Sequence, residues 1–181
     1  MRAALDACVL YPTVLREILT DVAKAGLFAP IWSARILEEW RLAAARLGSD
    51  GAAVASAEIA ALRSRFPQAE IAAPSDSRAA GLDLPDPDDA HVIDAALAGG
   101  ATAIVTANLR DFPRGAMAAV GLRAVHPDPF LLDLWAHEPD PVAAAIHAAH
   151  DRARALGGGD MSLRDMMKRA RLPRLGRAMA R

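Results

Sequence analysis

The acidic residues after Pro85 are the part of the sequence best suited to metal-ion or phosphate chemistry. Asp86, Asp88 and Asp89 lie within a few positions of one another, and an apolar run that includes Val92 follows directly. Acids also suit a helix N-terminus, where Asp88 would be the N-cap and Asp89 would lie in the first turn. Carboxylates this close raise one another's pKa unless a cation lies among them. The segment therefore predicts either helix capping or cation binding, and other parts of the chain must separate the two.

Further acids fall where an α/β fold would bring them together. Asp6 ends an apolar run, Glu38 and Glu39 lie in a predicted helix capped by Ser33, and Asp111 follows a predicted strand. Ligands of parallel sheets bind beyond the carboxyl ends of the strands. Converging buried carboxylates require a metal ion or paired arginines. Hard oxygen ligands without Cys or His metal-binding spacing favour Mg²⁺ or Mn²⁺ over zinc.

Alternating strands and helices must position these residues. Short apolar or β-branched runs predict strands or extended pieces at 2–10, 27–31, 69–73, 101–106 and 122–126. Helical periodicity and caps predict helices at 12–26, 33–48, 50–65 and 88–99. This alternation indicates an α/β fold, a three-layer α/β/α sandwich with a short, mainly parallel sheet.

The strand signals cease after Pro127, where a helical extension is expected. Helices are predicted at 130–135 and 141–156, followed by a glycine-rich break at 157–159. Ser162 and Asp165 form a capping box for a last, basic helix that Pro173 is expected to end. We therefore divide the chain into a domain at 1–126 and helical C-terminal residues at 127–181.

Composition excludes some classes of protein. The chain has 181 residues, of which 53% are hydrophobic, enough to bury a core, and no run approaches the apolar length of a transmembrane helix. Asp6 interrupts the apolar N-terminal run, so a secretory signal peptide is not expected. Cys8 is the single cysteine and has no basic neighbour in sequence, which predicts a structural thiol. We expect a cytoplasmic protein with no membrane partner.

Blocks of sequence, in order along the chain, resemble those of PIN domains. They are Asp6–Pro12, Ile36–Trp40, Asp86–Val92 and Thr106–Pro113, and the resemblance extends over residues 1–126. It is closest to the PIN ribonucleases related to VapC toxins. The resemblance implies a metal-dependent endoribonuclease that uses one or two Mg²⁺ or Mn²⁺ ions, as the toxin of a toxin–antitoxin pair.

The same resemblance assigns roles to individual residues. It implies that Asp6, Glu39, Asp89 and Asp111 are catalytic and bind metal, with Asn108 as a further metal ligand and Thr106 as a supporting polar residue. Glu39 is preferred over Glu38 because the family's acid directly precedes the apolar residue that is Trp40 here. Some relatives carry aspartate at the position of Asn108. The uncharged amide of Asn108 would hold an outer metal ion less tightly than a carboxylate.

The resemblance and the charge pattern also suggest partners. The resemblance implies an RNA substrate and an antitoxin partner, and the methionines of the C-terminal tail suggest a contact with a partner or, in a homodimer, with a second copy. The alternative function is a non-cleaving PIN-like module that binds RNA or protein. Residues 151–181 hold nine Arg and Lys and three Asp, a net charge of +6, so with a total of −1 the first 150 residues carry −7. Arg164, Lys168 and Arg171 recur at helical spacing, which predicts either RNA phosphate contacts or a solvated stripe.

Overall fold

The chain folds into two compact units. The computed structural model describes residues 1–46, 48, 50–72, 74 and 76–180. The first unit consists of Met1–Tyr11 and Ala29–Val125, and the second of Pro12–Phe28 and His126–Arg181. We expected a domain boundary after residue 126, and the C-terminal part of the second unit begins at His126. Helix α2 (Thr13–Lys24), however, groups with the C-terminal helices and not with the sheet.

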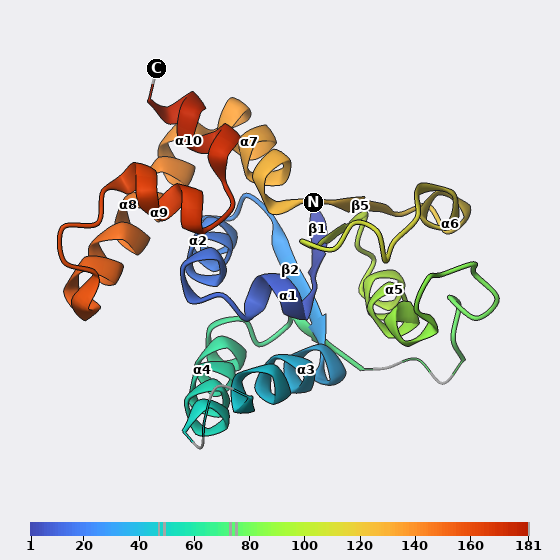
Figure 1. The fold of residues 1–181 in the computed structure, drawn as a ribbon. Helices are drawn as coiled ribbons and strands as arrows, with labels where there is room; N and C mark the ends of the chain where they lie inside the picture. Colours follow the sequence, from blue (N-terminus) through green and yellow to red (C-terminus); the bar gives the residue numbers. More distant parts are fainter. Residues whose placement is uncertain (47, 49, 73, 75, 181) are drawn as a thin grey trace. The chain divides into compact units, whose positions relative to one another are not determined.

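A five-stranded parallel sheet organises the first unit (Figure 1). Its strands are β1 (Arg2–Leu5), β2 (Ala29–Ser33), β3 (Glu70–Ile71), β4 (Ala103–Val105) and β5 (Arg123–Val125). Their spatial order is β3-β2-β1-β4-β5, and each pairing between neighbours is parallel. The predicted α/β class with a short parallel sheet is therefore confirmed. The strand expected at 69–73 includes residue 73, which lies outside the described residues.

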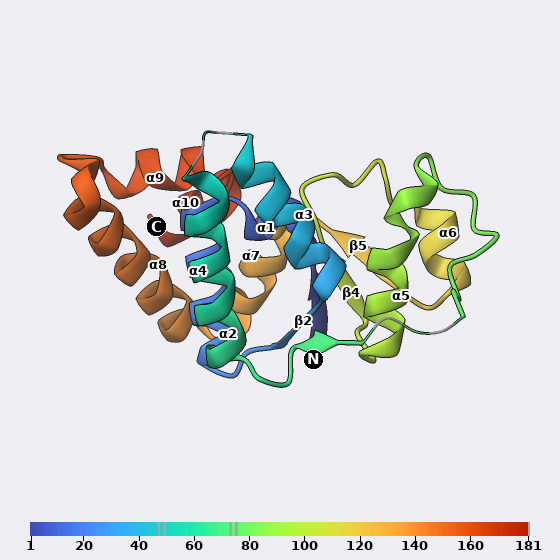
Figure 2. The same ribbon diagram turned by 90° about the horizontal axis from the view of Figure 1, so that it is seen from below.

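Helices of the first unit pack on this sheet and on one another. They are α1 (Ala7–Leu10), α3 (Ala34–Ala45), α4 (Gly51–Arg65), α5 (Ala90–Ala98) and α6 (Arg114–Ala119). Figure 2 shows α3 lying against α4 and α5 lying beside β4. Gly99, at the end of α5, packs so closely that an added Cβ would lie 2.2 Å from the Cδ1 atom of Ile31 in β2. A residue with a Cβ atom at this position would require the Ile31 side chain to shift.

Two predicted boundaries in the first unit are wrong, the end of the first strand and the start of the helix after Pro85. An aspartate lies at each of the true boundaries. The expected strand at 2–10 stops at Leu5, because the Asp6 carbonyl accepts the N–H groups of Val9 and Leu10 and the chain turns into α1. The helix cap near residue 88 is supplied by Asp86, whose Oδ1 atom accepts the Asp88 N–H over 2.9 Å. A 3₁₀ turn, Pro87–Asp89, then leads into α5.

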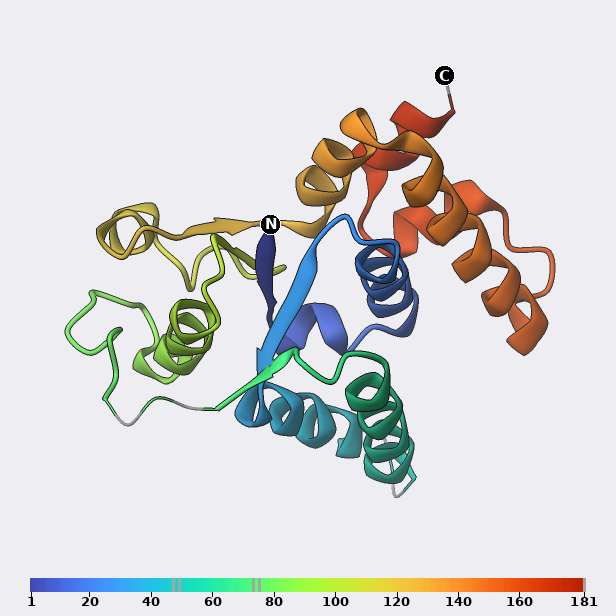
Figure 3. The ribbon, with the colours of Figure 1, turned by 180° about the vertical axis from the view of Figure 1, so that it is seen from behind.

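The second unit is helical (Figure 3). It combines α2 with α7 (Pro127–His137), α8 (Pro139–Ala153), α9 (Leu163–Arg169) and α10 (Pro173–Met179). Arg152 of α8 pairs with Glu17 and Asp21 of α2 over 2.8 and 2.6 Å. Contrary to expectation, Pro173 begins a further helix, and the buried Asp128 carboxylate accepts N–H groups of its first turn.

A helix that crosses a bilayer must be both long and apolar. Within the described ranges, no helix is both long enough and apolar enough to cross a bilayer.

Candidate active site

Asp6 and Thr106 meet where the central strands of the sheet end. Asp6 follows β1 and Thr106 follows β4, and these strands pair with Leu5 opposite Val105. The Asp6 N–H donates to the Val105 carbonyl over 3.1 Å, which extends the ladder by one residue. The buried Thr106 hydroxyl donates to the Asp6 Oδ2 atom over 2.7 Å. Both residues therefore lie at the edge where α/β proteins bind their ligands.

The Cys8 thiol completes the surroundings of Asp6. It donates to the same Oδ2 atom over 3.0 Å, and its sulfur accepts the Ala107 N–H over 3.2 Å. Burial, followed by the negative charge of Asp6, raises the pKa of the Cys8 thiol to about 12. The sulfur therefore stays protonated at neutral pH and holds the carboxylate in place, the structural role that its surroundings in sequence predict.

The charges of Asp89 and Asp111 act on the same region as that of Asp6. Asp89 ends the 3₁₀ turn before α5, and Asp111 lies in the turn that follows β4. Burial raises the pKa of Asp89 from 3.8 to about 6, with further contributions from the negative charges of Asp111, Asp6 and Asp86. Charges couple in this way only at short range. Asp6 and Asp111 therefore lie near enough for their charges to act on Asp89, and we call these three residues the acid cluster.

Glu39 faces the start of α5, whereas its neighbour Glu38 does not. Helix α3 begins after Ser33, whose hydroxyl accepts the N–H of the residue three positions later, as the sequence predicts for an N-cap. The Glu39 Oε1 atom lies 2.8 Å from His91 Nε2. The exposed Glu38 carboxylate instead accepts two bonds from Arg41, over 2.6 and 2.7 Å. Glu39 therefore lies beside the helix that follows Asp89, and Glu38 is occupied by Arg41.

His91 links Glu39 to the acid cluster. It lies two residues after Asp89, and its charge opposes the rise in the pKa of that carboxyl. Its side chain is 13% exposed, and among the described residues its buried Nδ1 atom has no hydrogen-bond partner. The bond between Nε2 and Glu39 indicates a histidine that positions a carboxylate.

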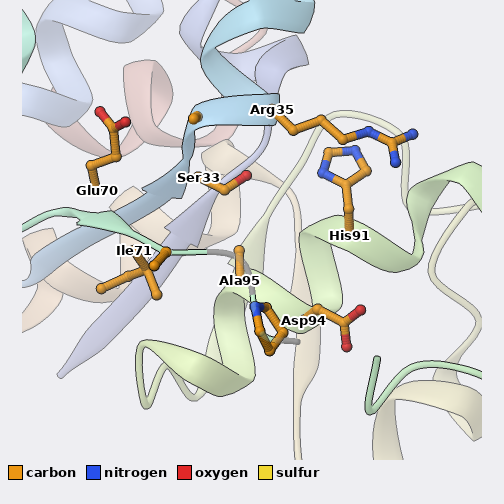
Figure 4. Close-up of a pocket in the computed structure, with 10 residues that line it drawn as sticks. Ser33, Arg35, Glu70, Ile71, His91, Asp94 and Ala95 are labelled. Carbon is orange, nitrogen blue, oxygen red and sulfur yellow. The ribbon is translucent and has the colours of Figure 1, made fainter. Parts of the chain in front are cut away.

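Arg35 is a residue of this region that sequence reasoning missed. Its Nε atom lies 3.5 Å from Glu39 Oε1, and its Nη2 atom lies 3.5 Å from Asp88 Oδ1 and 3.3 Å from the Asp88 carbonyl oxygen. Figure 4 shows Arg35 and His91 close together, with Ser33, at a cavity of about 550 Å³. The spacing of Arg35 and Glu39, one helical turn apart, was the signal that could have identified it.

Thr106 also shapes the turn that carries Asn108. The Asn108 N–H donates to the Thr106 hydroxyl oxygen over 3.0 Å, and the Asp111 N–H donates to the Asn108 carbonyl over 3.1 Å. This turn leaves the Asn108 side chain exposed and connects Thr106 to Asp111. The segment from Thr106 to Asp111 therefore carries a hydroxyl, an amide and a carboxylate close to one another in sequence, after the end of β4.

The chemical types of these side chains suit a hard divalent cation. Carboxylate, hydroxyl and amide oxygens are ligands that Mg²⁺ or Mn²⁺ accepts, and a cation would relieve the repulsion seen in the raised pKa of Asp89. In the described part of the chain, however, no group of three or more His, Cys, Asp or Glu side chains is arranged to hold a metal ion. The residues fit the ion by type and charge, and binding would require their side chains to draw together.

Two of the three basic residues predicted to contact RNA line a groove in the second unit. Arg164 and Lys168 of α9 line a groove of about 700 Å³, together with Arg177 of α10. Helix α9 ends at Arg169, and Arg171 follows it with a positive φ of 58°. The predicted helical stripe is therefore wrong at Arg171, because the helix ends before that residue.

Comparison with known proteins places part of the chain in a family. A family model described as "PIN domain" matches residues 2–110. A protein named "Putative ribonuclease VapC50", from Mycobacterium tuberculosis (strain ATCC 25618 / H37Rv), is 49% identical over 45 residues. That match covers 25% of this chain and 27% of the relative, so the chain spans about a quarter of the relative's length. No solved structure matches the chain.

Proposed function

The chain belongs to the PIN domain family, and we propose that it is a metal-dependent endoribonuclease that hydrolyses phosphodiester bonds of RNA. Its most direct support is the position of Asp6 at the end of the sheet where ligands bind, together with the raised pKa of Asp89, which burial causes first and the negative charges of Asp111, Asp6 and Asp86 increase. Asp6, Glu39 and Asp89 lie within the matched residues 2–110, and Asp111 lies one residue beyond them. A nuclease needs a cation among such acids, because a phosphate would otherwise be repelled.

The proposed roles follow from the contacts of each residue. Asp6, Glu39, Asp89 and Asp111, with Asn108, would hold one or two Mg²⁺ or Mn²⁺ ions. Such an ion activates water and offsets negative charge on the phosphate in the transition state. Thr106 would act as a positioning residue, because its hydroxyl holds the Asp6 Oδ2 atom together with the Cys8 thiol. Asp6 is then presented in one orientation before substrate arrives.

Electrostatics makes RNA binding depend on the ion. The first 150 residues carry a net charge of −7, and the acid cluster concentrates negative charge at the proposed site. The protein without metal should therefore bind and cut RNA poorly. We propose that Arg164 and Lys168 supply phosphate contacts in the second unit, where they line the groove. Arg171, which lies beyond the end of α9, is proposed as a further phosphate contact outside this groove.

We further propose that the protein is a cytoplasmic toxin of a toxin–antitoxin pair. An antitoxin would silence it by placing an Arg or Lys side chain among the acids, in the place of the cation. The name of the VapC50 relative supports a ribonuclease, and the surplus of acids suits this form of inhibition. Co-purification with the product of a small neighbouring reading frame, and toxicity on induction, would test the pairing. A neighbour that neither binds nor protects would favour a nuclease without an antitoxin.

A module that binds RNA or protein without cutting is the second candidate. The observation that favours it is that no three acidic, histidine or cysteine side chains of the described residues are arranged to hold a metal. One experiment separates the two candidates. Purified protein is incubated with a panel of tRNA, rRNA and mRNA, with Mn²⁺, with Mg²⁺ or with EDTA. Cleavage that requires the ion and is lost in Glu39→Gln supports the nuclease, whereas binding without cleavage supports the module.

A further inference from the structure

The cavity of about 550 Å³ in the first unit has no part in the chemistry described above. Its lining includes polar and charged side chains, Ser33, Arg35, Glu70, His91 and Asp94, and apolar ones, among them Ile71 and Ala95 (Figure 4). Strands β2 and β3 both end here, on the side of a parallel sheet where ligands bind. Its volume falls within the range of about 300–1,000 Å³ that is typical of sites for small organic groups.

Two side chains join this cavity to the proposed active site. Arg35 and His91 both line it, and both contact Glu39, over 3.5 and 2.8 Å. Arg35 also contacts Asp88, the residue before the acid cluster's Asp89. A group that entered the cavity would therefore lie beside the acids, separated from them by Arg35 and His91.

Arg35 holds its acidic partners less tightly than Arg41 of the same helix holds its own. Its distances to Glu39 Oε1 and Asp88 Oδ1 are both 3.5 Å, each through one nitrogen atom. Arg41 contacts both oxygens of Glu38, over 2.6 and 2.7 Å. Bidentate, short pairs are the strong ones, and the Arg35 side chain is 53% exposed. Arg35 can therefore exchange a carboxylate for a phosphate.

We infer that the cavity is a nucleotide subsite for single-stranded RNA. Arg35 contacts a phosphate next to the one that is cleaved, and the attached sugar and base enter the cavity beside Ile71 and Ala95. The inference rests on the proposed ribonuclease function. A strand that approaches the acid cluster is repelled along its length except where a cation meets it, and Arg35 provides a cation at the edge of that cluster. Ile71 and Ala95 suit the face of a base. The two carboxylates of the lining already have partners, since Glu70 pairs with Arg63 and Asp94 accepts the N–H groups of Arg78 and Ala79.

Three variants of the full chain test the subsite. Arg35→Gln removes the proposed phosphate contact, and Arg41→Gln removes one positive charge from the same helix as a matched control. Ala34→Glu adds a carboxylate at an exposed position that lines the cavity, in the first turn of α3, where an acid favours the helix. Binding of a nuclease-resistant single-stranded RNA analogue, with 2′-O-methyl and phosphorothioate groups, is measured in Mn²⁺ over a range of salt concentrations.

The subsite predicts a specific pattern. Arg35→Gln should weaken binding and lower the slope of log K against log salt by about 0.7, the value for one phosphate contact to a single strand. It should raise KM for RNA cleavage and leave kcat near the wild-type value, because the contact is made in the ground state as well as in the transition state. Ala34→Glu should also weaken binding, and Arg41→Gln should match the wild type.

Other results would overturn the inference. If the wild type binds and cuts RNA but Arg35→Gln behaves like Arg41→Gln, the cavity is not a subsite, while the ribonuclease function stands. A fall in kcat with unchanged KM would mean that Arg35 acts on Glu39 and not on a nucleotide. If the wild type neither binds nor cuts RNA in Mn²⁺, the ribonuclease function and the subsite fail together.

Discussion

Replacing Asp89 with asparagine should stabilise the metal-free protein at neutral pH. Burial and the charges of Asp111, Asp6 and Asp86 raise the pKa of Asp89 from 3.8 to about 6. The folded state therefore binds the Asp89 proton more tightly than the unfolded state does. Asparagine keeps the shape of the side chain and removes its charge, and no side-chain capping bond of α5 is lost, since Asp89 makes none.

The sign and the size of the effect follow from proton linkage. Stability due to the raised pKa is fully present below about pH 3.8 and is lost as the pH rises through about 6. A shift of that size corresponds to about 3 kcal/mol. Because the Asp89 side chain is only partly buried, solvent screening reduces this to about 1–2 kcal/mol. Asp89→Asn should gain that free energy of unfolding at pH 7.5 and gain little at pH 4.

Urea unfolding at pH 4 and pH 7.5, without metal, measures this difference. Asp83→Asn, which removes one negative charge from an exposed position in the same unit, is the control for net charge. Saturating Mn²⁺ at pH 7.5 should stabilise the wild type more than Asp89→Asn, because the ion offsets the same repulsion. Equal stability of wild type and Asp89→Asn at pH 7.5, or equal gains in both control and variant, would refute the idea that the acid cluster is strained by its charges.

Three further outcomes are expected from the same structure. Gly99→Ala should lower the free energy of unfolding by about 1–3 kcal/mol, because the added Cβ would lie 2.2 Å from the Ile31 side chain, and urea unfolding would show it. Iodoacetamide at pH 8 should modify Cys8 slowly in the folded protein and quickly in urea, because the pKa of the buried thiol is about 12; equal rates would contradict that environment. Replacing Arg164 and Lys168 together with Gln should lower the salt slope of RNA binding by about 1.4 if each contacts a phosphate, and an unchanged slope would leave them as solvated residues.

The fold was largely predictable because the strands are short, apolar and separated by clear helix signals. The run at 101–106 and the cap at Ser33 gave a strand and a helix where the structure has them. The strand predicted over the whole run at 2–10 was wrong, because apolar side chains of this run are buried both in β1 and in helix α1 that follows. Periodicity does not reveal a change of backbone direction at a single residue such as Asp6.

The candidate site was predictable only in part. Strand ends pointed to Asp6, and the run of acids around Asp89 pointed to a second component, whereas Thr106 was predicted only from the resemblance to PIN domains. The contact of His91 with Glu39 and that of Arg35 with Asp88 depend on how α3 approaches α5 and the turn before it. That approach is a tertiary property, set by packing between helices distant in sequence, and local patterns do not encode it.

The central claim is that the acid cluster holds the ion that RNA cleavage requires. Calorimetric titration of Mn²⁺ into the full chain and into Asp6→Asn, with cleavage of one RNA measured on the same samples, tests it most directly. We predict that the wild type binds Mn²⁺ and cuts only with the ion present, and that Asp6→Asn loses most of the binding and the cleavage while remaining folded. Undiminished cleavage by Asp6→Asn, or cleavage by the wild type in EDTA, would contradict the claim.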